Sequence, residues 1–308
     1  FVLEKAFEGT PYARDVIGLG EHLKNPRLSQ LIKFYNDWYV PENMALVISG
    51  NVKAKSLVRL IQNTFGRLQP SETPERITCP EFNVKGRVSY TSKSSYYPST
   101  CIIYNGVKNG DPDEYALEVC LHLLTNASST GALDKLTLSG DVMGASASSL
   151  SFIGAGRVLL QAVPFYDELQ RRYDSSKKVE AFLTKAVKSV RDGEFTQDDL
   201  DAVKLNLSRD FDLMMESNEG KVSAIADIFV NGQSVDDLLG FKENIDAVTM
   251  DDVKRVAAKY LNDNFIVIDN EIGTPEKKQK IKKPDYDPIV PPVGQSSMYA
   301  QRFKAMQA

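Results

Sequence analysis

A long-range internal repeat is the feature of the sequence that most constrains its fold. Residues 38–48 and 259–269 align at an offset of 221 and share a tyrosine and an asparagine ahead of an apolar run. A second pair of blocks, 15–19 and 237–241, aligns at an offset of 222, with an aspartate and a glycine in common. Two collinear blocks at nearly equal offsets favour a duplicated unit of about 220 residues over chance similarity.

The repeat predicts how the 308 residues are divided into domains. Each copy consists of a glycine-containing turn, a helix, an aromatic residue and a short strand, and only the last third of the first copy is present. Residues 1–76 are therefore expected to be the C-terminal part of a truncated first α+β domain, and 77–272 a complete second domain of the same type. Residues 273–308 are rich in proline and lysine, as in an extended linker. Because the sequence starts at Phe1 without a methionine, we interpret it as a fragment or a mature piece of a longer protein.

The spacing of apolar residues in the truncated part predicts two helices joined by a short strand over 45–49. The first helix has one apolar face, marked by Leu28, Leu31, Ile32 and Tyr35. The apolar residues of the second helix are expected to face inward, and they are Leu57, Leu60, Ile61 and Phe65.

The second copy alternates between strand and helix patterns. The predicted elements are strands at 86–92 and 100–107, a helix at 111–126, two strands within 141–163, helices across 174–261, a strand at 265–269 and a short terminal helix at 298–306. Thr196 with Asp199, and Thr249 with Asp252, have the spacing of capping boxes, with aspartate in place of glutamate.

Composition excludes several classes of protein. The net charge of −4 gives no reason to expect nucleic-acid binding, which normally needs a concentrated basic face. No apolar run approaches the ~20 residues that span a bilayer. Cys79, Cys101 and Cys120 are widely spaced and lack a C-x-x-C pair, so we expect buried free thiols rather than a metal knuckle or a disulfide framework.

The sequence contains few candidates for catalytic or metal-binding residues. His22 and His122 are the two histidines, and neither lies in an H-E-x-x-H or H-x-x-E-H motif that would place two ligands on one helical face. Zinc needs three or four protein ligands, so we expect both to be ordinary core or boundary histidines. Four serines lie in a strand of small residues without a G-x-S-x-G elbow, which favours close packing over nucleophilic catalysis. They are Ser146, Ser148, Ser149 and Ser151.

A family resemblance comes from Thr10–Gly18, with its Pro-Tyr…Ile-Gly turn, and from Leu31–Gly50, with its Trp-Tyr-Val-Pro-Glu-Asn-Met link. Together they resemble the pitrilysin/insulinase family of inverted zinc metallopeptidases. The resemblance continues through the second copy to Asp269 and covers nearly the whole chain. It implies α+β domains, each a mainly antiparallel sheet packed with helices on one side. Four such domains form two bowls around a closed chamber in which peptides are cut.

The resemblance also implies what is missing. The family's H-x-x-E-H helix and its third zinc ligand, a glutamate, lie in the first part of the first domain, which is absent here. In such enzymes zinc activates a water and the motif glutamate is the general base. We therefore expect no catalytic and no metal-binding residue in this chain, zinc only in a full-length parent, and no activity of the chain alone. Its expected partners are the missing N-terminal catalytic segment, the second half of the parent and peptide substrates.

A second family signature is an arginine and a tyrosine, seven residues apart, which grip the substrate carbonyl in the other half of the enzyme. The matching positions hold Leu136 and Met143, which cannot donate the hydrogen bond. Either the chain is the C-terminal part of the zinc-bearing half of a bacterial two-half enzyme, where the pair is not expected, or the parent is an inactive structural paralogue. Substrate-binding residues stay unknown. Because bacterial members of this type are often exported, we expect a periplasmic or otherwise exported protein.

The truncation has a physical consequence. A partial first domain would leave apolar surface uncovered, so residues 1–70 are expected to pack on the second domain, to self-associate or to be stabilised by a missing segment.

Overall fold

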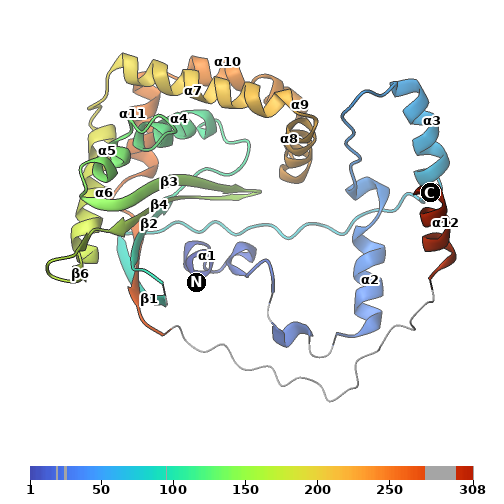
Figure 1. Ribbon diagram of the computed structural model, residues 1–308, viewed down its shortest axis with the longest axis horizontal. Helices are drawn as coiled ribbons and strands as arrows, with labels where there is room; N and C mark the ends of the chain where they lie inside the picture. Colours follow the sequence, from blue (N-terminus) through green and yellow to red (C-terminus); the bar gives the residue numbers. More distant parts are fainter. Residues whose placement is uncertain (19, 24–25, 95, 275–295, 308) are drawn as a thin grey trace. The chain divides into compact units, whose positions relative to one another are not determined.

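The computed structural model describes residues 1–18, 20–23, 26–94, 96–274 and 296–307 (Figure 1). The chain divides into two compact units, Phe1–Glu276 and Lys277–Ala308. In the second unit the structure describes α12 (Met298–Gln307), which confirms the predicted terminal helix. The remainder of the predicted linker, over 275–295, lies outside the described residues. No helix in the described ranges is both long and apolar enough to cross a lipid bilayer.

A five-stranded sheet forms the centre of the first unit, in the order β1-β7-β2-β4-β3. The strands are β1 (Arg87–Ser94), β2 (Ser99–Asn105), β3 (Val142–Phe152), β4 (Ala155–Pro164) and β7 (Phe265–Ile272). β1 and β7 run parallel, and the other neighbouring pairs run antiparallel. The short strands β5 (Tyr166–Asp167) and β6 (Arg172–Tyr173) form a separate hairpin. The expectation of a mainly antiparallel sheet is confirmed.

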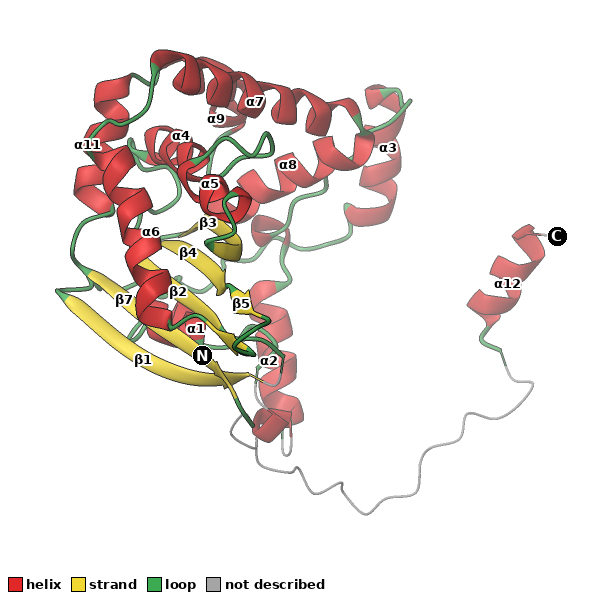
Figure 2. Cartoon of the chain, turned by 60° about the vertical axis from the view of Figure 1, so that its left-hand side comes forward, coloured by secondary structure: helices red, strands yellow, loops and turns green. Residues whose placement is uncertain are grey.

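Helices from the stretches between β2 and β3 and between β4 and β7 lie on one side of this sheet (Figure 2). They are α4 (Glu114–Leu124), α5 (Ala132–Leu138), α6 (Ser176–Arg191), α7 (Gln197–Glu216), α8 (Asn218–Asn231), α9 (Val235–Leu239), α10 (Phe241–Ala247) and α11 (Met250–Tyr260). Alternate strand residues such as Ile102 and Val267 join the buried faces of α4, α6 and α11 in the main hydrophobic cluster. This two-layer arrangement confirms the α+β class with helices on one side.

Side-chain caps divide the region predicted as helical over 174–261. Both predicted capping boxes are present, Thr196 with Asp199 at the start of α7 and Thr249 with Asp252 at the start of α11. A third, which the sequence analysis missed, begins α9. Each cap satisfies amide groups that the first helical turn leaves without partners, so each marks where a new helix begins.

The opposite face of the sheet is covered by the first residues of the chain. α1 (Val2–Ala6) leads into Phe7, which is fully buried against Ile103 and Ile266 of the sheet. The hydroxyl of Tyr12 donates to the carbonyl of Ile153 at 2.7 Å. Residues 1–12 therefore pack on the sheet that is built from residues 87–272.

Arg157 of β4 fastens this segment to the sheet. Its side chain is buried and donates from Nε to the Ala6 carbonyl at 2.7 Å, from Nη1 to the Gly156 carbonyl at 2.7 Å and from Nη2 to the Phe82 carbonyl at 2.6 Å. The rings of Phe7 and Phe82 each lie 5.3 Å from the guanidinium carbon. Burial lowers the pKa of Arg157. The hydrogen-bond partners of this cation are backbone carbonyls rather than a carboxylate. Arg157 of β4 therefore links the chain at Ala6 and at Phe82 to the sheet.

The predicted strand at 45–49 is wrong. These residues form no regular secondary structure and pair with no strand in the described part of the chain. A strand is held by hydrogen bonds to neighbours, and residues 1–76 contain no other strand among those described to supply them.

The prediction that the apolar residues of the second helix of this region face inward is also wrong. α2 (Leu28–Trp38) and α3 (Ala54–Phe65) have no buried residue, and Leu60 and Phe65 are 59% and 49% exposed.

Replacing Arg157 tests the role of this buried cation. Arg157→Met keeps much of the aliphatic stem but leaves the Ala6 and Phe82 carbonyls without this donor, whereas the Gly156 carbonyl still accepts from the Gly106 amide. The free energy of unfolding should fall by about 3 kcal/mol, because charged hydrogen bonds are lost in a buried site. Urea denaturation followed by circular dichroism measures the change, and limited proteolysis should release residues 1–10 earlier. Arg172→Met, at an exposed position of β6, is the matched control. Equal stability of the two variants would contradict this role.

Candidate functional site

The two histidines lie on different elements. His22 is exposed, in the short helix Gly20–Leu23. His122 lies on α4, where Nδ1 is 3.0 Å from the Glu118 carbonyl and therefore serves as a donor. The Glu118 carboxylate is 3.5 Å from the same nitrogen. This local pairing within one helix gives His122 a structural explanation.

The residues do not fit the zinc site of the resembled family. Within the described ranges, no group of three or more histidine, cysteine, aspartate or glutamate side chains is arranged to hold a metal ion. The sequence also lacks the H-x-x-E-H motif. No catalytic step through zinc is therefore assigned to this chain.

The thiols are poor nucleophiles where they are buried. Cys79, Cys101 and Cys120 are all free, and the last two are buried while Cys79 is half-buried. Burial raises the pKa of both Cys101 and Cys120 to about 12. The thiolate is the reactive form, so these two side chains serve as small core residues.

The four serines of β3 line an edge of the sheet rather than an activated site. Ser149 and Ser151 lie on the same side of the strand, with their hydroxyl oxygens 3.0 Å apart. Ser146 and Ser148 are exposed. The alternation follows the strand period of two, which agrees with a packing and surface role.

The corner between α5 and β3 holds the two positions that correspond to the family's arginine and tyrosine. Leu136 on α5 is partly buried and packs against the main cluster, and Met143 on β3 is 57% exposed. Neither side chain has a group that donates a strong hydrogen bond, so this corner cannot polarise a substrate carbonyl.

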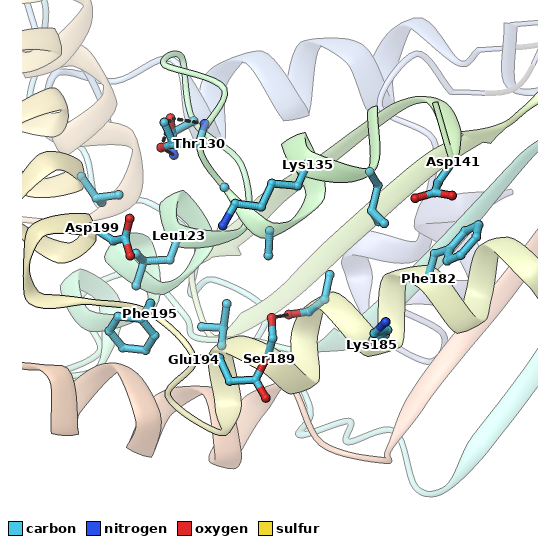
Figure 3. Close-up of a pocket in the computed structure, with 17 residues that line it drawn as sticks. Leu123, Thr130, Lys135, Asp141, Phe182, Lys185, Ser189, Glu194, Phe195 and Asp199 are labelled. Carbon is cyan, nitrogen blue, oxygen red and sulfur yellow. Dashed lines mark hydrogen bonds between the residues drawn. The ribbon is translucent and has the colours of Figure 1, made fainter. Parts of the chain in front are cut away.

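A cavity of about 380 Å³ lies beside this corner, between α4, α5, α6 and α7 (Figure 3). Its charged lining residues are Lys135, Asp141, Lys185, Glu194 and Asp199, and Phe182 and Phe195 add apolar surface. Sequence reasoning did not find it, because α5 was not predicted and its lining comes from four separate helices.

Two polar side chains of this cavity, Asp199 and Ser189, are engaged in local hydrogen bonds. Asp199 accepts hydrogen bonds from the amide and hydroxyl of Thr196, which lower its pKa. Lys135 extends toward the Asp199 side of the cavity (Figure 3). The Ser189 hydroxyl donates to the Ala186 carbonyl at 2.8 Å and so is not set against a base.

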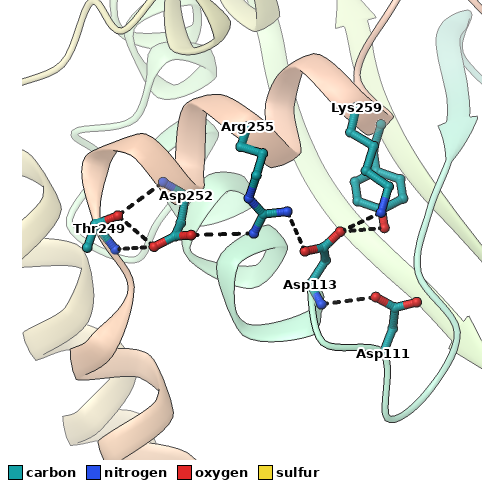
Figure 4. A network of polar contacts seen from close by, with 7 residues as sticks. Asp111, Asp113, Thr249, Asp252, Arg255 and Lys259 are labelled. Atoms are coloured by element: carbon teal, nitrogen blue, oxygen red, sulfur yellow. Dashed lines mark hydrogen bonds and ion pairs between the residues drawn. The ribbon is translucent and has the colours of Figure 1, made fainter.

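The densest cluster of charged groups surrounds Asp113, the residue that precedes α4 (Figure 4). Its carboxylate accepts from Arg255 Nη1 at 2.6 Å, from Lys259 Nζ at 2.7 Å and from the Tyr260 hydroxyl at 2.8 Å. Burial alone raises the pKa of Asp113, but the hydrogen bonds from Lys259, Arg255 and Tyr260 outweigh it and lower the pKa to about 2. Because Arg255, Lys259 and Tyr260 of α11 all donate to this one carboxylate, the cluster ties the start of α4 to the end of α11 and is structural.

Asp113→Asn should weaken this tie. The change removes the charge that holds Arg255 and Lys259, and the free energy of unfolding at pH 7 should fall by about 1–3 kcal/mol. Because the pKa is lowered from 3.8 to about 2, the contribution of Asp113 is present above about pH 4 and is lost as the pH falls toward 2. Thermal unfolding across this pH range checks both points. Asp251→Asn, whose side chain is 92% exposed, is the control. A wild-type protein and a variant that lose stability in parallel below pH 4 would contradict the account.

Comparison with known proteins supports the family resemblance. The family model of the peptidase M16 inactive domain matches residues 27–207. Zinc protease PqqE of Helicobacter pylori is 24% identical over 267 residues, which cover 82% of this chain and 56% of PqqE. The chain thus spans just over half the length of this curated relative.

Solved structures show the same fold. A protease from Helicobacter pylori superposes with a TM-score of 0.76 at 19% identity, covering 88% of this chain and 65% of that chain. The first half of the periplasmic protease PqqL from Escherichia coli superposes with a TM-score of 0.66 at 16% identity, covering 87% of this chain and 60% of that chain. The family match covers more than half of the 308 residues. It confirms the resemblance to zinc metallopeptidases: the chain belongs to the M16 peptidase family and contains its inactive domain.

Proposed function

We propose that this chain is the non-catalytic part of a zinc-dependent endopeptidase, which degrades peptides in an enclosed chamber. In this proposal residues 1–76 complete the first domain, 77–272 form the second domain and 273–308 link the two halves of the enzyme. The chain packs against the zinc-bearing segment and forms part of the chamber wall. The parent is a periplasmic or otherwise exported protein of the two-half type, and this chain is the C-terminal part of its zinc-bearing half.

The exposed apolar side chains of α2 and α3 carry this proposal. Both helices are amphipathic, yet their large apolar residues face solvent. Those more than half exposed are Leu28, Leu31, Ile32, Phe34, Tyr35, Val58 and Leu60. An apolar surface of this kind marks a place where another protein segment packs. A zinc-bearing segment of the same parent is the partner that the M16 family membership and the partial coverage of PqqE favour.

Peptide hydrolysis by this chain and by its full-length parent tests the proposal. Intact mass is measured first, to establish that each sample is the intended polypeptide. Only the parent should cleave a fluorogenic peptide, and a zinc chelator should abolish that cleavage, because the described residues of this chain include no zinc ligand set and its sequence lacks the H-x-x-E-H motif. Restoring zinc to the treated parent is the control for the chelator. Hydrolysis by the purified chain alone would overturn the proposal.

The same surface predicts self-association of the isolated chain. Two copies can shield their apolar helices from water, so light scattering should give a mass that rises with concentration. The double variant Phe34→Glu and Leu60→Glu should be monomeric, since each change places a charge on the apolar side. Leu169→Glu, at a 98% exposed position in the β5–β6 turn, is the control and should still self-associate. A wild-type chain that stays monomeric throughout would contradict this prediction.

An inactive structural paralogue is the alternative function. Leu136 and Met143 favour it, since they occupy the positions at which the resembled family has its substrate-gripping arginine and tyrosine. If the full-length parent cleaves no peptide under any metal condition, this alternative replaces the peptidase proposal, and the two residues become marks of a lost activity.

A further inference from the structure

A second cavity, of about 370 Å³, lies where the end of β7, the start of β2 and the beginning of α6 meet. Thr100 and Asp269 line it from neighbouring strands and are direct cross-strand partners. They share the helix-covered side of the sheet with Ile102 and Val267, two residues further along their strands. The cavity is separate from the one beside α5 and from the Asp113 cluster.

Two polar atoms in this cavity are buried without a partner. Thr100 is 0% exposed, and neither its Oγ1 nor Oδ1 of Asp269 has a hydrogen-bond partner among the residues that the structure describes. A buried polar atom without a partner costs about 1–3 kcal/mol, and more when it is charged. A carboxylate oxygen only accepts, so a group that satisfies Asp269 must be a donor.

The charge of the lining favours a cationic donor. Asp174, Asp269 and Glu271 all line the cavity, and its described lining includes no lysine, arginine or histidine. Lys178 pairs with Asp174 at 2.8 Å, which leaves two carboxylates without a basic partner in the lining. The N-terminus of α6 opposes a cation, but its partial charge is about half of one elementary charge. Asp269 also interacts electrostatically with Arg87, which lies outside the lining, but the charged side chains in the described lining itself are all carboxylates.

The size of the cavity and the apolar part of its lining narrow the kinds of ligand that it can bind. A water molecule needs only about 30 Å³ of liquid volume, far less than this cavity offers. Among the described residues, no group of three or more histidine, cysteine, aspartate or glutamate side chains is arranged to hold a metal ion. Pro98, Pro164 and the ring of Tyr173 form apolar walls, and an aromatic ring attracts a cation placed over its face. We propose that this cavity binds a primary ammonium group on an alkyl chain, with Asp269 and Thr100 as its hydrogen-bond partners.

Titration calorimetry with the 308-residue chain tests the proposal. The probes are n-butylamine, Nα-acetyl-lysine amide and the neutral isostere 1-butanol. Butylamine should bind and butanol should not. The lysine amide distinguishes a peptide side chain from a free amine as the source: binding of both amines admits either, and binding of butylamine alone restricts the site to free amines.

Variants of Thr100 and Asp269 test whether butylamine binds at Thr100 Oγ1 and Asp269 Oδ1. Asp269→Asn should weaken butylamine binding about tenfold or more because it removes the negative charge that faces the ammonium group, and Thr100→Val should weaken it about threefold because it removes a hydrogen-bond acceptor. Asp263→Asn is the matched control, with a 98% exposed side chain outside the cavity. If a variant fails to fold, NMR of the wild-type chain replaces it, and the amide signals of Thr100 and Asp269 should shift on adding butylamine.

Several results would overturn the proposal. They are the absence of butylamine binding at millimolar concentration, equal binding of 1-butanol, full affinity in Asp269→Asn, and displacement of the amine by sodium or potassium ions at equal concentration. The last result would assign the cavity to an inorganic cation. None of these outcomes depends on whether the full-length parent is a peptidase.

Discussion

The pairing of β7 with β1 and β2 is the interaction on which the rest of the structure depends. β7 comes from the far end of the folded unit, yet it lies second in the sheet and bonds β1 in parallel and β2 in antiparallel orientation. Its residues alternate between the two hydrophobic clusters, with Phe265 and Val267 on the helix side and Ile266 and Ile268 on the other. This one strand therefore joins both layers and closes everything between β1 and α11 into one unit.

Each side of that strand has a distinct role. The helix side carries the main core, the Asp113 cluster that secures α4 to α11, and the cavity beneath α6. The other side receives residues 1–12, which Arg157 holds through backbone carbonyls. A charge solvated in this way requires the chain to approach closely from three directions, so the position of the N-terminal segment is specified rather than adjustable. In the proposed enzyme, this contact would hold one segment of the first domain on the second.

The sequence predicted those parts of the fold that depend on local chemistry or on a complete set of partners. The strands, the helix at α4 and two capping boxes followed from periodicity and side-chain type. The two copies of the repeated motif have similar sequences but different structures. Tyr260 is buried against Asp113 and leads into β7, whereas Tyr39, at the equivalent position, is exposed and leads into a segment without a strand partner. Similar local sequences thus differ because one has neighbours and the other has none among the described residues. Arg157, Thr100 and Asp269 were missed for a related reason, since a polar residue in an alternating strand usually faces solvent.

The central claim is that the apolar sides of α2 and α3 pack against another part of the same M16 protein. Hydrogen–deuterium exchange of this chain alone and within its full-length parent measures this most directly. The account predicts that amides of α2 and α3 exchange markedly more slowly in the parent, while those of β7 exchange equally slowly in both. Equal exchange of α2 and α3 in the two proteins would contradict the claim, because the apolar surface would then remain uncovered in the complete protein.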